Sequence, residues 1–275
     1  MVGRRLADGA SHAHGRGHSL IELLIAMALG VALVGAAALL YRAQREAVTV
    51  AADAASIRDA GMTALLMLGQ QIEMAGYVPA DGLGNDAVHP NHVDVAPGVF
   101  GCDSGMPASD DDPSACLPVS GASDAVVVRY VDDGVATWKS TAGQATDCLG
   151  QGVGMAGERV VVVNRFSVGI GDAGEPQLYC RGNEGGKQPV VAGIERLSVR
   201  YWMRGAIAPV QARSVGAGAW SDVVAVDVCV VVRGTRAIAK HRYFDCDGAV
   251  VPGPDGRVRQ TFSRRVAVRN NEGPP

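Results

Sequence analysis

One uninterrupted apolar run dominates the pattern of hydrophobic and polar residues along the chain. It extends from Leu23 to Leu40 and directly follows Gly17-His18-Ser19-Leu20-Ile21-Glu22. A helix over this run would be ~27 Å long at ~1.5 Å per residue, close to the ~30 Å hydrocarbon core of a bilayer once Ser19 and Leu20 are added. The run therefore predicts a membrane-spanning helix.

The segment before the run, residues 1–17, is basic, with arginines opposed by a single acid, Asp8. A secretory signal peptide is cut after its apolar segment, in an Ala-x-Ala setting. Here the small residue that a peptidase could cut, Gly17, lies before the apolar run. Cleavage there would leave the helix attached to the mature protein, with His18 as the first residue.

Glu22 directly precedes the apolar run. Insertion of a charge at this position in a membrane costs a free energy on the order of a few kcal/mol unless the charge is paired. We therefore expect this carboxylate to be functional. The alternative is a plain membrane anchor whose basic leader stays in the cytoplasm. Arg42 and Arg45 follow the run on its other side, so local charge sets the orientation only weakly.

A helical pattern continues beyond the membrane run, with apolar residues at steps of three and four and polar residues opposite them. We expect the helix to end at Gly76, shortly before Pro79, and to measure on the order of 85 Å from Ser19 to Ala75. Interior glycines are expected to weaken it locally. The apolar stripe comprises Met62, Leu65, Leu66, Gly69 and Ile72, and the glycines are Gly30, Gly35 and Gly61.

Loops and strands follow Pro79. Residues 80–123 are rich in turn dipeptides and predict a long irregular insertion. Six later segments have strand composition; two of them alternate clearly between apolar and polar positions, and residues 169–174 separate two others as a hairpin turn would. The six are 125–131, 159–166, 177–181, 194–203, 223–233 and 260–269, of which 194–203 and 223–233 alternate most clearly.

An antiparallel sheet laid against the second half of a long helix is an α+β arrangement. We expect a leader at 1–17, a transmembrane helix at 18–40, an amphipathic continuation of that helix at 41–79, and a β-rich domain at 80–275 that contains the insertion at 80–123. Roughly 235 residues remain without leader and span, enough for one sizeable domain.

Charge and cysteine content narrow the function classes. The formal net charge is −3, so no basic excess favours nucleic acid. The cysteines all lie C-terminal to the apolar run, and an even number there predicts disulfides in an oxidising periplasm. We favour Cys102–Cys116, which would close a loop worth roughly 3 kcal/mol in the chain-entropy model. Cys148–Cys180 and Cys229–Cys246 would complete a sequential pairing, although other connectivities stay open.

Other candidate sites have simpler interpretations. Two acidic segments, Asp81–Asp86 and Asp245–Gly248, lack the spacing of a calcium loop. A third, Asp110–Asp112, is interpreted as a solvated loop face, with a calcium or partner contact as the alternative. The histidines lack zinc-ligand spacing from the cysteines. A C-terminal arginine cluster could contact DNA, but placement on a solvated surface is the simpler interpretation. No Gly-x-Ser-x-Gly or Ser-x-x-Lys motif indicates hydrolysis. We expect no catalytic residue, metal, cofactor or enzyme activity. The histidines are His89, His92 and His241; the arginines are Arg257, Arg259, Arg264, Arg265 and Arg269.

The N-terminal layout resembles the type IV prepilin signature, in which a short basic leader ends in Gly and Glu occupies the fifth mature position. Gly17 and Glu22 match these positions, whereas His18 replaces the usual Phe. Later blocks resemble the PilW family of minor type IV pilins over most of the chain apart from 80–123. Major pilins tend to have Pro at the position of Leu39, and the absence of that Pro is more typical of minor subunits. The blocks are Gly61–Tyr77, Gly193–Met203, Trp220–Arg233 and Thr261–Asn270.

This resemblance implies a type IV pilin fold and a minor pilin that acts as a structural and priming subunit of type IV pilus assembly. A prepilin peptidase and N-methyltransferase would cut after Gly17 and methylate His18, and an N-terminal amine would neutralise Glu22 during assembly. The implied location is the inner membrane, as a single-pass protein with a periplasmic domain, followed by the cell-surface pilus.

The implied partners are other minor pilins, the major pilin, the inner-membrane assembly platform and a tip adhesin. A type II secretion pseudopilin is the alternative within this class. An adhesin pilin that binds DNA or a surface is the alternative from another class, although nucleic acid is not an expected partner.

Overall fold

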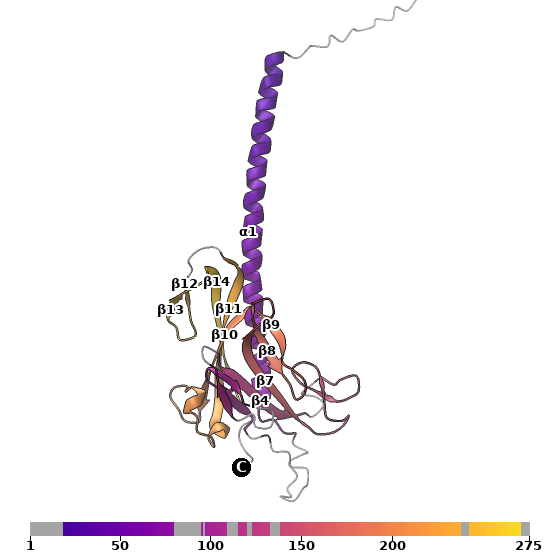
Figure 1. Cartoon of the computed structure of the whole chain (residues 1–275), viewed down its shortest axis with the longest axis vertical. Coiled ribbons are helices and arrows are strands. Elements are labelled where there is room, and N and C mark those ends of the chain that lie inside the picture. Colours follow the sequence, from indigo (N-terminus) through magenta and orange to yellow (C-terminus); the bar gives the residue numbers. More distant parts are fainter. Residues whose placement is uncertain are drawn as a thin grey trace, which may run out of the picture. The chain divides into compact units, whose positions relative to one another are not determined.

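The structure is a computed structural model that describes residues 19–79, 95, 97–108, 115–119, 123–132, 138–237 and 242–270. The chain divides into two compact units, Met1–Ala51 and Ala52–Pro275. One helix, α1 (Leu20–Met74), contributes to both and is drawn in indigo and purple in Figure 1.

The described part of the first unit is the helix from Leu20 to Ala51, preceded by Ser19. Every described residue in it is exposed. An 18-residue window of α1 has a mean hydropathy of 2.6, and none of that window is buried. By length and composition α1 is therefore able to cross a membrane. The predicted helix is confirmed, while the limits of the span at 18–40 stay a prediction.

The second unit contains a five-stranded antiparallel sheet with the strand order β1-β4-β7-β8-β9. Strands β7 and β8 form the predicted hairpin, in which Ile170 lies opposite Pro176. The predicted strand at 125–131 is confirmed by β4. The strands are β1 (Val99–Cys102), β4 (Ala125–Val131), β7 (Val161–Ile170), β8 (Pro176–Arg181) and β9 (Gln188–Ala192).

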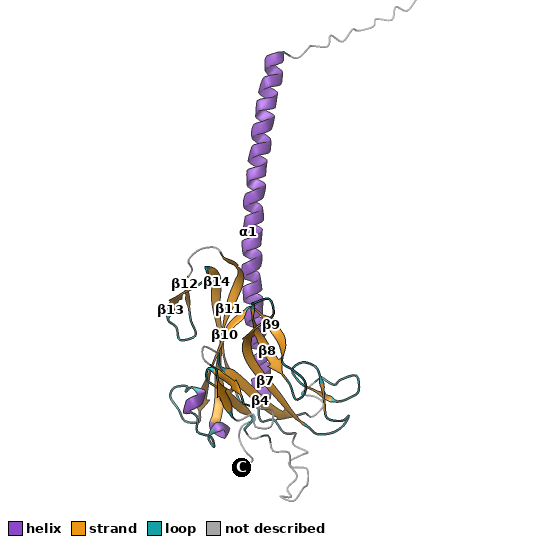
Figure 2. Ribbon diagram, viewed as in Figure 1, coloured by secondary structure: helices purple, strands orange, loops and turns teal. Residues whose placement is uncertain are grey.

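A second antiparallel sheet has the order β10-β11-β14, so the strands form two main sheets rather than one (Figure 2). Its strands are β10 (Ile194–Met203), β11 (Val223–Ala237) and β14 (Arg257–Ala267). Three short ribbons and two 3-10 turns complete the described elements: β2 (Gly105–Pro107) with β3 (Cys116–Pro118), β5 (Ala145–Thr146) with β6 (Gly152–Val153), β12 (Arg242–Phe244) with β13 (Val250–Pro252), η2 (Ala212–Ser214) and η3 (Trp220–Asp222).

The alternation predicted for the second sheet places one face of each strand in the core. Leu197, Val199 and Tyr201 of β10 are at most 1% exposed. On β11, the even-numbered residues Val226, Val228, Val230 and Val232 are equally buried. Ser198, Arg200 and Asp227 alternate with these residues and point to the opposite face, because successive strand side chains point to opposite faces. Val231 shares that face of β11 and is also buried.

The second half of α1 packs one face against the sheets, as predicted. The stripe predicted from the sequence is partly wrong, since Met62 and Leu66 are 58% and 54% exposed. Each directly follows a buried residue, Gly61 or Leu65. One residue corresponds to a rotation of about 100° around the helix, so Met62 and Leu66 point away from the buried face. The buried stripe comprises Ile57, Gly61, Ala64, Leu65, Leu68, Gly69 and Ile72.

Gly61 has a packing role that its effect on helix propensity does not reveal. A Cβ at this position would lie 2.3 Å from Cδ2 of Phe262 on β14. At Gly69 a Cβ would lie 3.0 Å from Nη1 of Arg264 on the same strand. The two glycines leave room on α1 for the side chains of Phe262 and Arg264, which alternate along β14. This close packing compensates for the low helix propensity of Gly, which costs about 1 kcal/mol per residue.

The expectation of an irregular segment over 80–123 is wrong for part of it. Strand β1 pairs with β4 over four residues, with Val99 opposite Val128, and all of β1 is buried. A four-residue strand between turn sequences carries too little periodicity to stand out, and its burial depends on a partner some 25 residues away. Residues 80–94 lie outside the described part of the chain.

Candidate functional site

Glu22 belongs to a hydrogen-bonded cap at the start of α1. Its Oε2 accepts a hydrogen bond of 2.9 Å from the backbone N–H of Ser19, and Ser19 Oγ accepts one of 3.3 Å from the N–H of Ile21. Reciprocal bonds of this kind form a capping box, which satisfies N–H groups that the first helical turn leaves free. The Ser-x-x-Glu spacing of Ser19 and Glu22 is the sequence signal for this cap.

The cap places the carboxylate in the first turn of the exposed apolar helix. Gly17 and His18 lie outside the described residues, so their predicted roles stay predictions. A Cβ added at Gly30 or Gly35 would have open space around it, with no side chain of the described residues within 4 Å. Small residues on an exposed apolar helix allow close approach of a second helix. This surface is therefore suited to helix association in lipid.

The C-terminal arginine cluster is largely neutralised by carboxylates. Arg259, whose side chain is 1% exposed, donates to Glu195 at 2.8 Å and to Asp255 at 2.7 Å. Arg257 donates to Glu175 at 3.0 Å. Because salt bridges satisfy these guanidinium groups, they do not form the free cationic surface that binding to nucleic acid requires.

Two further arginines of β14 are also paired with carboxylates. Arg265 binds both carboxylate oxygens of Asp227, at 2.6 and 3.0 Å, and stacks 4.1 Å from the ring centre of Trp202. Arg264 donates to Glu73 of α1 at 3.2 Å. A hollow of about 400 Å³ on the outward side of the three-stranded sheet is lined by the Arg265–Asp227 pair. Arg200 and Arg264 also line it, and their carboxylate partners are Asp247 and Glu73.

These ion pairs shift the titration of their carboxyl groups. The hydrogen bond from Arg259 is the main cause that lowers the pKa of Asp255 to about 2. Hydrogen bonds from Arg257 and then Arg233 lower the pKa of Glu175. At Asp227 burial works in the opposite direction, yet hydrogen bonds from Arg265 and Trp202 hold its pKa below the usual value. The network therefore stays ionised at neutral pH and links the turn before β8 to β10, β11 and β14.

The acidic turn at 245–248 has a structural explanation. Asp245 Oδ1 accepts the backbone N–H groups of Asp247 and Ala249 at 3.0 and 2.9 Å, which is the geometry of an Asx turn. Asp81–Asp86, Asp110–Asp112 and His241 lie outside the described residues. Within the described ranges, no group of three or more His, Cys, Asp or Glu residues could hold a metal ion.

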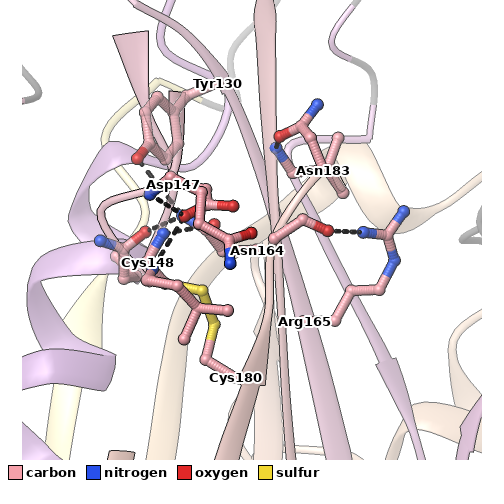
Figure 3. Close-up of a disulfide and its surroundings, with 12 residues drawn as sticks. Tyr130, Asp147, Cys148, Asn164, Arg165, Cys180 and Asn183 are labelled. Atoms are coloured by element: carbon pink, nitrogen blue, oxygen red, sulfur yellow. Dashed lines mark hydrogen bonds between the residues drawn. A yellow bond between two sulfur atoms is a disulfide. The ribbon is translucent and has the colours of Figure 1, made fainter. Parts of the chain in front are cut away.

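The six cysteines form three disulfides whose pairing is sequential: Cys102–Cys116, Cys148–Cys180 and Cys229–Cys246. Figure 3 shows the Cys148–Cys180 bond beside a buried polar cluster that includes Asn164 and Tyr130. Asn164 carries no signal in the sequence, because an isolated Asn within a strand does not indicate what it contacts.

Two family models match the sequence. Residues 165–270 match "Type IV Pilus-assembly protein W", and residues 13–38 match the "Prokaryotic N-terminal methylation motif". The sequence has no significant match among curated proteins. Among solved structures, the type IV-like pilin TTHA1219 from Thermus thermophilus is similar with 14% identity and a TM-score of 0.40, over 78% of this chain and 96% of that one.

The two matched regions cover distinct features of the chain. The N-terminal motif includes Gly17, Glu22 and most of the apolar run, and the C-terminal match begins on β7 and includes the three-stranded sheet. Between them, α1 packs its second half against antiparallel strands, as expected for the fold. The chain is thus similar to type IV pilins in two regions, a prokaryotic N-terminal methylation motif and a C-terminal region that resembles PilW.

Proposed function

We propose that this chain is a minor pilin that primes and joins type IV pilus assembly. The observation that carries the proposal is α1 itself: its first half is exposed and apolar with Glu22 in the first turn, and its second half is packed into a folded domain. An exposed apolar helix of this length needs lipid or other helices around it. A filament core built from such helices can replace the lipid.

In this proposal a prepilin peptidase cuts after Gly17, and the new amine of His18 is methylated. The subunit then resides in the inner membrane as a single-pass protein with a periplasmic domain. Glu22 caps its own helix in the single chain. During assembly an N-terminal amine pairs with this carboxylate and removes much of the cost of holding a charge in an apolar core.

Partners in this proposal are other minor pilins, the major pilin, the inner-membrane assembly platform and a tip adhesin. Pairing of the β14 arginines with carboxylates disfavours DNA as a ligand. A structural subunit needs no reaction of its own, and the proposal assigns no catalytic residue to the chain.

The test is complementation of a strain that lacks this gene, with wild-type protein, Glu22→Ala or Glu46→Ala. Glu46 is an exposed carboxylate on the same helix beyond the apolar run and serves as the matched control. We expect Glu22→Ala to accumulate in the membrane at mature size without restoring pili, and Glu46→Ala to restore them. Normal pilus numbers with Glu22→Ala would contradict the assembly mechanism. A null strain with normal pili and defective protein secretion would favour the type II pseudopilin instead.

A further inference from the structure

A buried amide side chain connects three segments of the domain that are far apart in sequence. Asn164 of β7 is fully buried. Its Nδ2 donates to Gln71 Oε1 of α1 at 2.6 Å. The same Nδ2 donates to Tyr130 Oη of β4 at 3.3 Å, and Oδ1 accepts the backbone N–H of Cys148 at 2.9 Å (Figure 3). Helix, sheet and disulfide loop therefore meet at one side chain.

The Cys148 N–H is held in place by covalent and hydrogen bonds. Cys148 is bonded to Cys180 of β8, and Cys180 lies opposite Phe166 of β7, two residues from Asn164. Within the loop, Asp147 Oδ1 accepts the N–H groups of Leu149 and Gln151 at 2.9 and 3.0 Å. The loop thus presents a fixed donor to Asn164 on the sheet face that meets α1.

The orientation of Asn164 depends on that donor. An Asn amide has one oxygen acceptor and one NH2 donor group, and a 180° flip exchanges them. With its oxygen engaged by Cys148, the NH2 group points to Gln71 and Tyr130. If the loop moves away, Asn164 loses the bond that selects this orientation, and the bond to α1 weakens with it.

We propose that the Cys148–Cys180 disulfide sets how firmly the last turns of α1 dock on the five-stranded sheet, with Asn164 as the positioning residue that transmits the effect. The other two disulfides serve as internal controls. Cys102–Cys116 links β1 to β3, and Cys229–Cys246 links β11 to the turn between β12 and β13. Neither contains a residue with a hydrogen bond to Asn164, whereas Cys148 donates one. Docking of α1 would then depend on correct oxidation at one specific pair.

Hydrogen exchange of the full chain in detergent micelles tests the proposal. Peptides that cover residues 65–74 report on helix docking, and peptides from β11 report on global stability. We expect Cys148→Ser/Cys180→Ser to accelerate exchange at 65–74 about tenfold relative to β11, and Cys102→Ser/Cys116→Ser and Cys229→Ser/Cys246→Ser to change this ratio less than about twofold. Equal acceleration in both regions, or the same ratio for a control pair, would overturn the proposal.

A double-mutant comparison tests the role of Asn164. In an Asn164→Leu background, removal of the Cys148–Cys180 pair should add little to exchange at 65–74, because the connection is already broken. A full additional effect would exclude Asn164 as the positioning residue. If the cysteine variant fails to fold, Gln71→Met keeps all three disulfides and removes only the contact on α1. It should accelerate exchange at 65–74 alone, and unchanged exchange there would overturn the proposal.

Discussion

Two buried tyrosines provide a matched test of how polar groups contribute to this core. Tyr201 is fully buried, and its hydroxyl has no hydrogen-bond partner among the described residues. It lies against Gly101, where a Cβ would be 1.8 Å from Oη, and beside Trp220, with ring centres 4.9 Å apart. Tyr130 is 2% exposed, but its Oη accepts a hydrogen bond from Asn164. The same Tyr→Phe change therefore removes an unpaired group in one case and a paired group in the other.

The expected effects have opposite signs. A buried unpaired hydroxyl costs about 1–3 kcal/mol, and its removal leaves a small void that costs part of this gain. Tyr201→Phe should therefore raise the free energy of unfolding by up to ~1 kcal/mol. Tyr130→Phe should lower it by ~1 kcal/mol, the net contribution of a typical hydrogen bond. The two variants should differ by about 1–2 kcal/mol.

Urea unfolding of the full chain in micelles, followed by far-ultraviolet circular dichroism at pH 7.5, measures both values. Burial raises the pKa of Tyr130 to about 12 and the pKa of Tyr201 well above its usual value, so both hydroxyls stay neutral in the assay. The reasoning fails if Tyr201→Phe destabilises the protein as much as Tyr130→Phe does. That result would mean that the Tyr201 hydroxyl has a partner, such as a buried water.

Three other changes test separate parts of the chain. Gly17→Leu should block processing, because the peptidase must accommodate a residue without a side chain at the cut, and mass spectrometry of membranes should then find only the precursor; a product about 17 residues shorter would contradict the leader assignment. Gly61→Val should lower the free energy of unfolding by about 1–3 kcal/mol through the clash with Phe262, and Gly61→Val/Phe262→Ala should lose less than the sum of its single variants. Asp255 has a depressed pKa of about 2, so its stabilising effect is complete above its usual pKa near 4 and is lost as the pH falls toward 2. Asp255→Asn should flatten the loss of stability between pH 4 and 2, and an unchanged acid profile would show that the ion pair with Arg259 contributes little.

Local sequence patterns predicted the elements that depend on short-range periodicity. The bounds of β4 and β10 match the predicted segments 125–131 and 194–203, and α1 ends at Met74, ahead of Gly76 with its φ of 75°. The Gly-x4-Glu spacing before the apolar run predicted a pilin-like chain without any structural information. These signals lie within some twenty residues of each other, so no distant partner is needed to recognise them.

Contacts between distant segments decided the rest. The division into two sheets, the inclusion of β1 and the pairing of Arg259 with Glu195 depend on which strands become neighbours. From the sequence alone, Gly61 only lowers the helix propensity of its segment. The structure shows that Phe262, which is distant in sequence, packs against it. Asn164 likewise has no distinctive sequence pattern, because its role comes from Gln71, Tyr130 and Cys148 meeting around it. Periodicity is a property of a single segment, whereas packing and hydrogen-bond partners exist only after the segments have come together.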